Sequence, residues 1–163
     1  MKTAYVLGEN ANKSLSPLIF NYWLEKNKIK AKYISKQIEP KNFNKELDHL
    51  LQNKDTCGLN ITIPFKEAVL KKIDHLDSHS IKIGAVNCLT RKKDIWLGNN
   101  TDWLGFLASI SDKSKKIKKD TAIVIGYGGA AKAIIYGLGF CGFKKIKIFN
   151  RTFKKIEKIS DNK

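Results

Sequence analysis

The segment GLNITIPFK, residues 58–66, carries three polar side chains at even-numbered positions of a mostly apolar stretch. This alternation predicts a β-strand on which Asn60 and Thr62 share one face and Lys66 follows at the strand end. An amide, a hydroxyl and an ammonium group can all donate hydrogen bonds, so together they suit a hydroxylated, anionic ligand. A strand face that is merely exposed to solvent would show the same pattern, and these residues alone do not decide between the two.

Two further segments carry similar groups. Ser14 and Ser16 precede an expected helix N-terminus, where backbone N–H groups can bind a carboxylate, although Ser16 could equally be only the N-cap of that helix. Asn87, Thr101 and Asp102 lie around an expected hairpin, where Asn and Asp are also common as ordinary turn residues. Each segment by itself therefore leaves a purely structural role open.

A glycine-rich turn with the pattern GxGxxA lies between an apolar run at 121–125 and a predicted helix. In dinucleotide-binding folds the first glycine permits a tight turn, the second lets the backbone approach a pyrophosphate, and the small third residue packs the helix on the strand. The helix N-terminus adds partial positive charge. A glycine turn without a ligand is the alternative, but a second strand follows, and we therefore predict a dinucleotide site. Its residues would be Gly126, Gly128, Gly129, Ala130 and Ala131.

The end of the second strand indicates which dinucleotide is bound. An NAD site usually has Asp or Glu there for the ribose hydroxyls, whereas this chain has Asn150, Arg151 and Thr152, with Lys155 close behind. An Arg side chain can hold a 2′-phosphate with two N–H groups. The sequence therefore predicts NADP as the cofactor, although a solvated basic helix start is the alternative.

Strands and helices alternate in a way that predicts an α/β protein. Strands are expected at 4–8, 33–38, 58–66, 121–126 and 144–150, a hairpin at 85–90 with 95–99, and helices from Ser16, after Pro40, at 65–76, from Thr101, at 127–140 and at 151–160. Alternation would place Ile63 and Phe65 on the apolar face of the third strand. The continuous apolar run at 121–125 predicts a strand buried on both faces. A Lys-rich stretch at 111–120 suggests a connector.

Composition restricts the class of protein. The chain has 163 residues, 42% of them hydrophobic, with 31 Lys and Arg against 15 Asp and Glu, giving a net charge of +16. This excess favours an anionic partner. A nucleic-acid-binding module is one alternative, but no motif of that class is present, and we expect no nucleic-acid or membrane partner.

Three unpaired cysteines, no secretory signal and no membrane span suggest a cytoplasmic protein. His75 and His79 could chelate a metal if both lay on one helix, but we expect no metal.

The blocks SLSP, NITIPFK, GAVN, GNNTDWLGF, GYGGAAKA and NRT follow one another along the chain. Their order resembles the shikimate dehydrogenase family, from the first strand to the end of the chain. The resemblance implies reversible, NADPH-dependent reduction of 3-dehydroshikimate to shikimate, in the chorismate route to aromatic amino acids. It also implies an N-terminal α/β substrate-binding domain, residues 1–103, and an incomplete Rossmann-type NADP-binding domain, residues 104–163. A homodimer is compatible with this prediction.

The resemblance also implies residue roles. Ser14 and Ser16 would hold the substrate carboxylate, and the substrate hydroxyls would contact Asn60, Thr62, Asn87 and Asp102. Lys66 and Asp102 would form the catalytic pair, with Lys66 as the preferred acid and base. The pyrophosphate would contact 126–131, and the adenosine phosphate would contact Asn150, Arg151, Thr152 and Lys155. This scheme requires Lys66 and Asp102 to meet across a cleft that faces the glycine turn.

Some features depart from the family. Phe20, Cys88 and Tyr127 stand where the family commonly has His, Thr and a small residue. Only two of the six strands of a dinucleotide fold are present, and roughly 100 residues would complete it. We therefore expect weak binding of shikimate and little or no NADP-linked oxidation by this chain. Ser14 and Ser16 favour shikimate over the related quinate, but a quinate/shikimate dehydrogenase and a non-catalytic shikimate-binding fragment stay open.

Overall fold

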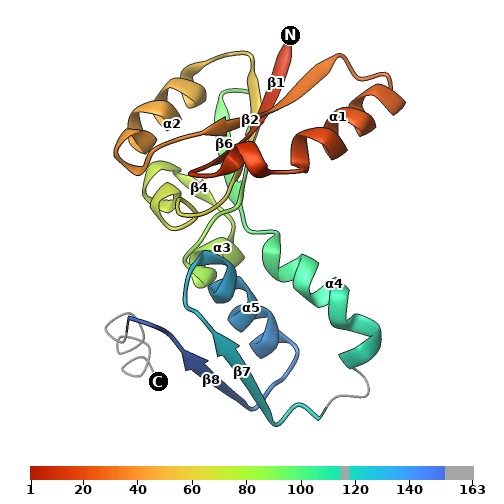
Figure 1. Cartoon of the computed structure of the whole chain (residues 1–163), viewed down its shortest axis with the longest axis vertical. Coiled ribbons are helices and arrows are strands. Elements are labelled where there is room, and N and C mark those ends of the chain that lie inside the picture. Colours follow the sequence, from red (N-terminus) through yellow and green to blue (C-terminus); the bar gives the residue numbers. More distant parts are fainter. Residues whose placement is uncertain (115–117, 153–163) are drawn as a thin grey trace.

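The computed structural model describes residues 1–114 and 118–152, the first range with side chains up to residue 110. It contains two sheets at opposite ends of an elongated molecule, joined by helices α3, α4 and α5 (Figure 1). Within the described ranges, no helix combines the length and the apolar character needed to cross a membrane. The predicted α/β class is confirmed.

The larger sheet has six strands in the order β2-β1-β3-β5-β6-β4. Its strands are β1 (Lys2–Gly8), β2 (Ala31–Gln37), β3 (Thr56–Ile61), β4 (His75–Leu76), β5 (Cys88–Lys92) and β6 (Ile95–Asn99). β1 lies between β2 and β3 and pairs in parallel with both, so the carboxyl ends of these three strands lie at one edge. β5 runs antiparallel to β3 and forms the predicted hairpin with β6.

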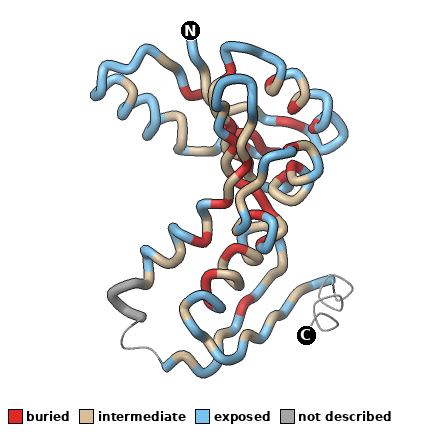
Figure 2. Tube along the Cα trace, turned by 180° about the vertical axis from the view of Figure 1, so that it is seen from behind, coloured by how far each residue is buried: buried red, intermediate tan, exposed pale blue. Residues whose placement is uncertain are grey.

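Helices cover this sheet unequally. α2 (Phe43–Gln52) follows the short 3₁₀ helix η2 (Pro40–Asn42) and buries Phe43, Leu47 and Leu50, as their spacing predicts. They join a core whose other buried members come mainly from the strands and from the 3₁₀ helix η3 (Ala68–Lys72). α1 (Ser16–Lys26), after the 3₁₀ helix η1 (Ala11–Lys13), has no buried residue and lies at the β2 edge. Figure 2 shows buried residues concentrated in the sheet and between the sheets.

The second sheet consists of two parallel strands, β7 (Thr121–Ile125) and β8 (Lys145–Phe149), connected by α5 (Gly129–Phe140). α4 (Asp102–Ser114) leads to it from the first sheet, and α3 (Ser78–Ile83) contacts α5. A small buried cluster of Ile83, Ala85, Trp103 and Ala133 joins the two parts. The predicted strand, helix, strand order at 121–150 is therefore confirmed.

Three expectations about elements are wrong. The third strand ends at Ile61 rather than 66, because Phe65 N–H bonds the Thr62 carbonyl and turns the chain, which leaves Ile63 exposed. The segment 65–76 is not one helix but η3 followed by β4, whose residues pair with β6. β7 is not buried on both faces: Val124 is 8% exposed but Ile125 is 87% exposed, because α5 packs on one side of a two-stranded sheet.

Smaller differences concern helix ends and two histidines. Leu15, not Ser16, is the N-cap of α1. The Thr101 hydroxyl bonds Asn87, while its carbonyl accepts from Gly105 in the first turn of α4. His75 lies in β4 and His79 in α3, so the two histidines do not share the helix on which they could chelate a metal together. Of the helix expected at 151–160, residues 151 and 152 are not helical, and the rest lies outside the described residues.

Candidate functional site

A cavity of about 440 Å³ opens at the carboxyl edge of β1 and β3, beside the start of α1. Every residue that the sequence assigns to the substrate lines it: Ser14, Ser16, Asn60, Thr62, Lys66, Asn87 and Asp102. The fold thus brings together four segments that are separated by up to 88 positions in the chain. The edge of a sheet where parallel strands end is a common place for a ligand site.

Lys66 and Asp102 form the centre of this cavity. The Lys66 Nζ atom lies 2.6 Å from Asp102 Oδ2, and the two side chains are 13% and 27% exposed. Partial burial limits screening by water, so this charge-assisted hydrogen bond is stronger than one at an open surface. Asp102 begins α4, where the helix dipole favours a negative charge. The predicted contact between these two side chains is present.

Asn87 fixes the orientation of Asp102. Its Nδ2 atom donates to Asp102 Oδ1 at 2.7 Å and to the Thr101 hydroxyl at 3.0 Å, while its Oδ1 atom accepts from the Thr101 backbone N–H at 2.9 Å. The Asn87 side chain therefore holds the first residues of α4 against the end of the 85–87 loop. The Lys66 carbonyl accepts from Val86 N–H at 2.8 Å, which ties the lysine backbone to the same loop.

The serine pair lies at the α1 end of the cavity. Ser14 Oγ donates to Ser16 Oγ at 3.0 Å and accepts from the Ser16 backbone N–H at 3.2 Å. Two hydroxyls and the first turn of α1 thus face the same space. Such a group of neutral donors suits a carboxylate.

Two residues that the sequence analysis did not select support the site. Tyr33 of β2 bonds Asn60 Oδ1 at 2.7 Å through its hydroxyl. The buried side chain of Asn100 donates to the Ala85 carbonyl and accepts from Asp102 N–H, so it also positions Asp102 beside Lys66. The polar cluster GNNTD signalled Asn100, but a tyrosine in an alternating strand carries no such signal.

Burial shifts two acidic groups near the cavity. Burial raises the pKa of Tyr33 to about 12, the neighbouring Cys88 adds to this rise, and a hydrogen bond with the Ser16 side chain opposes it. Burial also raises the pKa of the Cys88 thiol. Both Tyr33 and Cys88 are therefore protonated at neutral pH. Phe20, which departs from the family pattern, lines the cavity and stacks on Tyr33 with ring centroids 4.4 Å apart.

The glycine turn lies where β7 passes into α5. Gly126 has a φ of +104°, which favours glycine, and its N–H bonds the Phe149 carbonyl at 2.7 Å. A Cβ atom at Gly126 or Gly128 would meet nothing within 4 Å, so both glycines border open space. Backbone N–H groups at the start of α5 are therefore accessible, as the binding of a pyrophosphate requires.

Gly129 has a different role from the neighbouring glycines. A Cβ atom there would lie 2.8 Å from Lys66 Cβ, closer than real Cβ contacts allow. A cavity of about 220 Å³ is lined by both residues, together with Gly128 and Glu67. The glycine turn thus directly adjoins the lysine of the substrate cavity, as the sequence predicts.

The residues predicted to select NADP lie beside the glycine turn and away from the substrate cavity. β7 and β8 are parallel neighbours with Ile125 opposite Phe149, so Asn150 follows next to Gly126. Asn150 Nδ2 donates to the Thr152 carbonyl at 2.9 Å, and Arg151 and Thr152 are exposed. This position fits the adenosine end of a dinucleotide whose pyrophosphate lies at 126–131. Lys155 lies outside the described residues.

Comparisons with known proteins agree with this geometry. The family described as shikimate dehydrogenase substrate binding domain matches residues 6–89. The chain is 36% identical over 162 residues to a shikimate dehydrogenase (NADP(+)) of Caldicellulosiruptor bescii, covering 99% of this chain and 56% of that protein. Against that of Aquifex aeolicus it is 34% identical over 155 residues, covering 95% and 57%. The chain thus spans a little over half the length of these relatives.

Solved structures share the fold over the whole chain. A crystal structure of shikimate dehydrogenase from Aquifex aeolicus superimposes with a TM-score of 0.88 and 31% identity, covering 99% of this chain and 60% of that one. The Thermus thermophilus enzyme in complex with NADP(H) and shikimate gives 0.82 and 28%, again covering 99% and 60%. The family match at residues 6–89 covers just over half of the 163 residues of the chain. This chain therefore belongs to the family of the shikimate dehydrogenase substrate binding domain.

Proposed function

We propose that the chain binds shikimate and 3-dehydroshikimate in the cavity at the edge of β1 and β3, as the substrate-binding part of an NADP-dependent shikimate dehydrogenase. The observation that supports this most is the convergence of all predicted substrate residues on one cavity around the Lys66–Asp102 pair. The division into residues 1–103 for substrate and 104–163 for the first part of the cofactor site belongs to the same proposal.

The cavity would orient the substrate by its two chemically different ends. The hydroxyls of Ser14 and Ser16, with the first turn of α1, would hold the carboxylate. Asn60, Thr62, Asn87 and Asp102 would bind ring hydroxyls, since amide and carboxylate groups supply both donors and acceptors. Each of these groups faces a cavity of about 440 Å³, large enough for a six-membered ring with its substituents.

Lys66 would carry the proton. NADPH, when bound, would supply a hydride to the carbonyl carbon of 3-dehydroshikimate. The Lys66 ammonium group would stabilise the negative charge that develops on the oxygen and donate a proton to it. Asp102, held by Asn87 and 2.6 Å from Nζ, would keep the ammonium group in place and orient the reacting hydroxyl in the reverse direction.

The cofactor would be held by backbone at 126–131 and by side chains after β8. The open space at Gly126 and Gly128 fits a pyrophosphate, and exposed Arg151 fits a 2′-phosphate that only NADP carries. Asn150, Thr152 and Lys155 would complete this end of the site.

A binding titration tests the substrate proposal. We expect shikimate to shift backbone amide signals of the cavity in NMR spectra of the ¹⁵N-labelled chain, and quinate to do so more weakly. Lys66→Ala should weaken shikimate binding about tenfold, the loss of one charge-assisted hydrogen bond. Lys71→Ala, an exposed lysine in η3, is the matched control and should bind normally. An absence of shikimate-dependent shifts would contradict the proposal.

Activity and other partners need separate assays. Absorbance of reduced nicotinamide would be followed with shikimate and NADP, then with quinate and NAD, and we expect little or no turnover.

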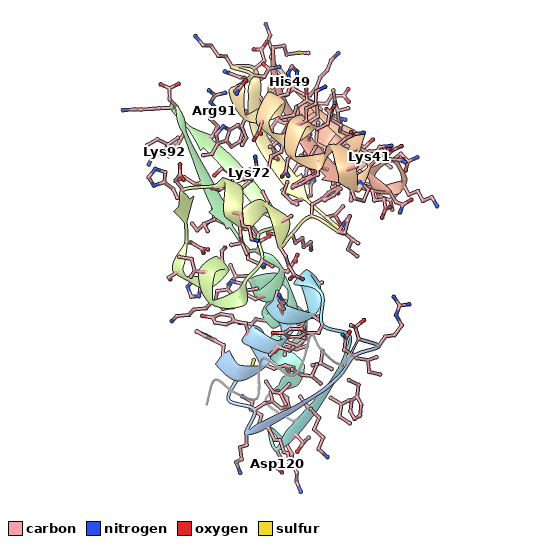
Figure 3. All side chains as sticks on the ribbon, turned by 90° about the vertical axis from the view of Figure 1, so that its left-hand side faces the viewer. Lys41, His49, Lys72, Arg91, Lys92 and Asp120 are labelled. Atoms are coloured by element: carbon pink, nitrogen blue, oxygen red, sulfur yellow. The ribbon has the colours of Figure 1, made fainter. Side chains whose placement is uncertain are left out.

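Figure 3 shows labelled basic residues coming from several elements, among them Lys41 of η2, Lys72 of η3 and Arg91 of β5. Because the sequence carries no nucleic-acid-binding motif, we propose no nucleic-acid partner. Salt-sensitive retention on DNA would overturn this. Homodimerisation and a cytoplasmic location are further predictions, and sedimentation tests the former.

A further inference from the structure

We propose that Tyr33 is a positioning residue of the shikimate cavity, because its hydroxyl holds the side-chain amide of Asn60, which lines that cavity. This inference rests on the proposed function, since it assigns Tyr33 a part in binding the same ligand. Tyr33 is 4% exposed and is not among the residues that line the cavity. It would therefore act through Asn60 rather than by touching the ligand.

The Tyr33 ring is fixed from several sides. The Asn21 side chain accepts from Tyr33 N–H at 2.9 Å and donates to its carbonyl at 2.8 Å, so α1 and β2 are tied at this residue. The ring stacks on Phe20 at an interplanar angle of 9°. With both the backbone and the ring held, the position of the hydroxyl is set by the fold and not by the ligand.

Donor and acceptor chemistry defines the bond between Tyr33 and Asn60. Asn60 Nδ2 lies 3.4 Å from the Asn87 carbonyl oxygen, which can only accept a hydrogen bond. The amide oxygen of Asn60 must therefore point the other way, towards Tyr33, and the Tyr33 hydroxyl must donate to it at 2.7 Å. The short bond to Tyr33 contributes more to this orientation than the long one to Asn87. One N–H of the Asn60 amide is then left for the cavity.

Asn60 in turn is linked to the Lys66–Asp102 pair. Its Nδ2 atom bonds the Asn87 backbone carbonyl, and the Asn87 side chain donates to Asp102 Oδ1 at 2.7 Å. The other Asp102 oxygen accepts from Lys66 Nζ at 2.6 Å. The Tyr33 hydroxyl therefore adjoins the polar contacts that hold the catalytic pair.

Replacing Tyr33 by Phe removes the hydroxyl and keeps the ring. We expect Tyr33→Phe to weaken shikimate binding about tenfold in the NMR titration, the effect of losing the hydrogen bond that orients Asn60. Tyr22→Phe, an exposed tyrosine on α1, is the matched control and should leave binding unchanged. Equal affinities of Tyr33→Phe and the wild-type chain would overturn the proposal.

A double-mutant cycle separates positioning from a general loosening of the cavity. If Tyr33 acts through Asn60, then Tyr33→Phe should have a much smaller effect on binding when Asn60 is already Ala. Full additivity of the two substitutions would show that Tyr33 does not work through Asn60. Melting temperatures of all variants check that each one is folded.

The Asn60 side-chain amide gives a readout that needs no ligand. Its two ¹⁵N–H signals can be assigned by their loss in Asn60→Ala, and we expect them to shift in Tyr33→Phe but not in Tyr22→Phe. Unchanged Asn60 signals in Tyr33→Phe would contradict the inference even if shikimate binds. If the wild-type chain fails to bind shikimate while these signals do shift, the proposed function fails and the positioning of Asn60 by Tyr33 stands.

Discussion

At the scale of single residues, the cavity is a set of polar groups whose partners are already arranged. Asn87 satisfies Asp102 and Thr101 at once, and Asp102 divides its two carboxylate oxygens between Asn87 and Lys66. Even a partly buried carboxylate is costly unless its oxygens are hydrogen-bonded, and here both are. The arrangement therefore keeps Lys66 close to one fixed point of the cavity.

Gly129→Ala should destabilise the protein, although alanine favours helices. The new Cβ would lie 2.8 Å from Lys66 Cβ, which is fixed to the backbone and cannot rotate away. Overpacking of this kind costs about 1–3 kcal/mol, more than the gain of up to about 1 kcal/mol in helix propensity. Urea unfolding would measure the difference.

Gly139→Ala in the same helix is the control for this substitution. A Cβ atom at Gly139 would meet nothing within 4 Å, so the free energy of unfolding should rise by up to about 1 kcal/mol. If both variants proved equally stable, the contact between Gly129 and Lys66 would not be as close as the structure shows.

Tyr33 should make stability depend on alkaline pH. Its pKa is raised from 10.0 to about 12 in the folded state, mainly by burial. The unfolded chain therefore loses this proton first, so the stabilisation is complete below pH 10 and is lost as pH rises through about 12. Between these values, the free energy of unfolding of the wild-type chain should fall relative to Tyr33→Phe by up to about 1.4 kcal/mol per pH unit.

Urea titrations of both proteins at several pH values would measure this slope. Lysine and other tyrosine ionisations are common to the two chains and cancel in the difference. A parallel pH dependence of the two chains would show that the Tyr33 hydroxyl is not buried.

At the scale of elements, the short segment after β3 links the two parts of the molecule. Lys66 and Glu67 precede η3, and Glu67 pairs with Lys132 of α5 at 2.6 Å. Lys132 also lies over the Tyr127 ring, 5.2 Å from its centroid. One turn further along α5, the His79 ring bonds the Tyr136 hydroxyl and stacks on Trp103. α5 is thus held against the first sheet by polar as well as apolar contacts.

The Glu67–Lys132 pair should contribute modestly to stability. Its side chains are 43% and 19% exposed, so water screens the attraction in part. A double-mutant cycle with Glu67→Gln and Lys132→Gln should give a coupling of about 0.2–1 kcal/mol that decreases with added salt. The Glu39–Lys41 pair, which is much more exposed, serves as the comparison and should show no measurable coupling. A coupling that does not change with salt would argue against an ion pair.

At the scale of the whole molecule, the two sheets differ in how completely they are covered. The six-stranded sheet and the segments that pack on it hold the larger buried core, whereas β7 and β8 expose Ile123, Ile125 and Phe149. Exposed apolar side chains on a short parallel sheet favour association between molecules. Solubility should therefore be limited by this two-stranded sheet and not by the six-stranded one.

Ile125→Lys should reduce aggregation without lowering the melting temperature, because Ile125 is 87% exposed. Val124→Lys is the matched contrast: Val124 is 8% exposed, and a buried, unpaired charge there should prevent β7 from forming. Light scattering and thermal unfolding distinguish the two variants. Aggregation of Ile125→Lys at the wild-type rate would show that other surfaces are responsible.

The sequence by itself determined the alternation of strands and helices, the glycine turn and the polar residues of the cavity, because periodicity and turn chemistry are local properties. It did not determine where β3 ends or that η3 and β4 replace a helix, since these depend on hydrogen bonds with the 85–87 loop and with β6. Likewise, only the tertiary structure decided that Tyr33 bonds Asn60 and that Gly129 contacts Lys66. Contacts between residues far apart in the chain have no local signature, so their partners become visible only once the chain is folded.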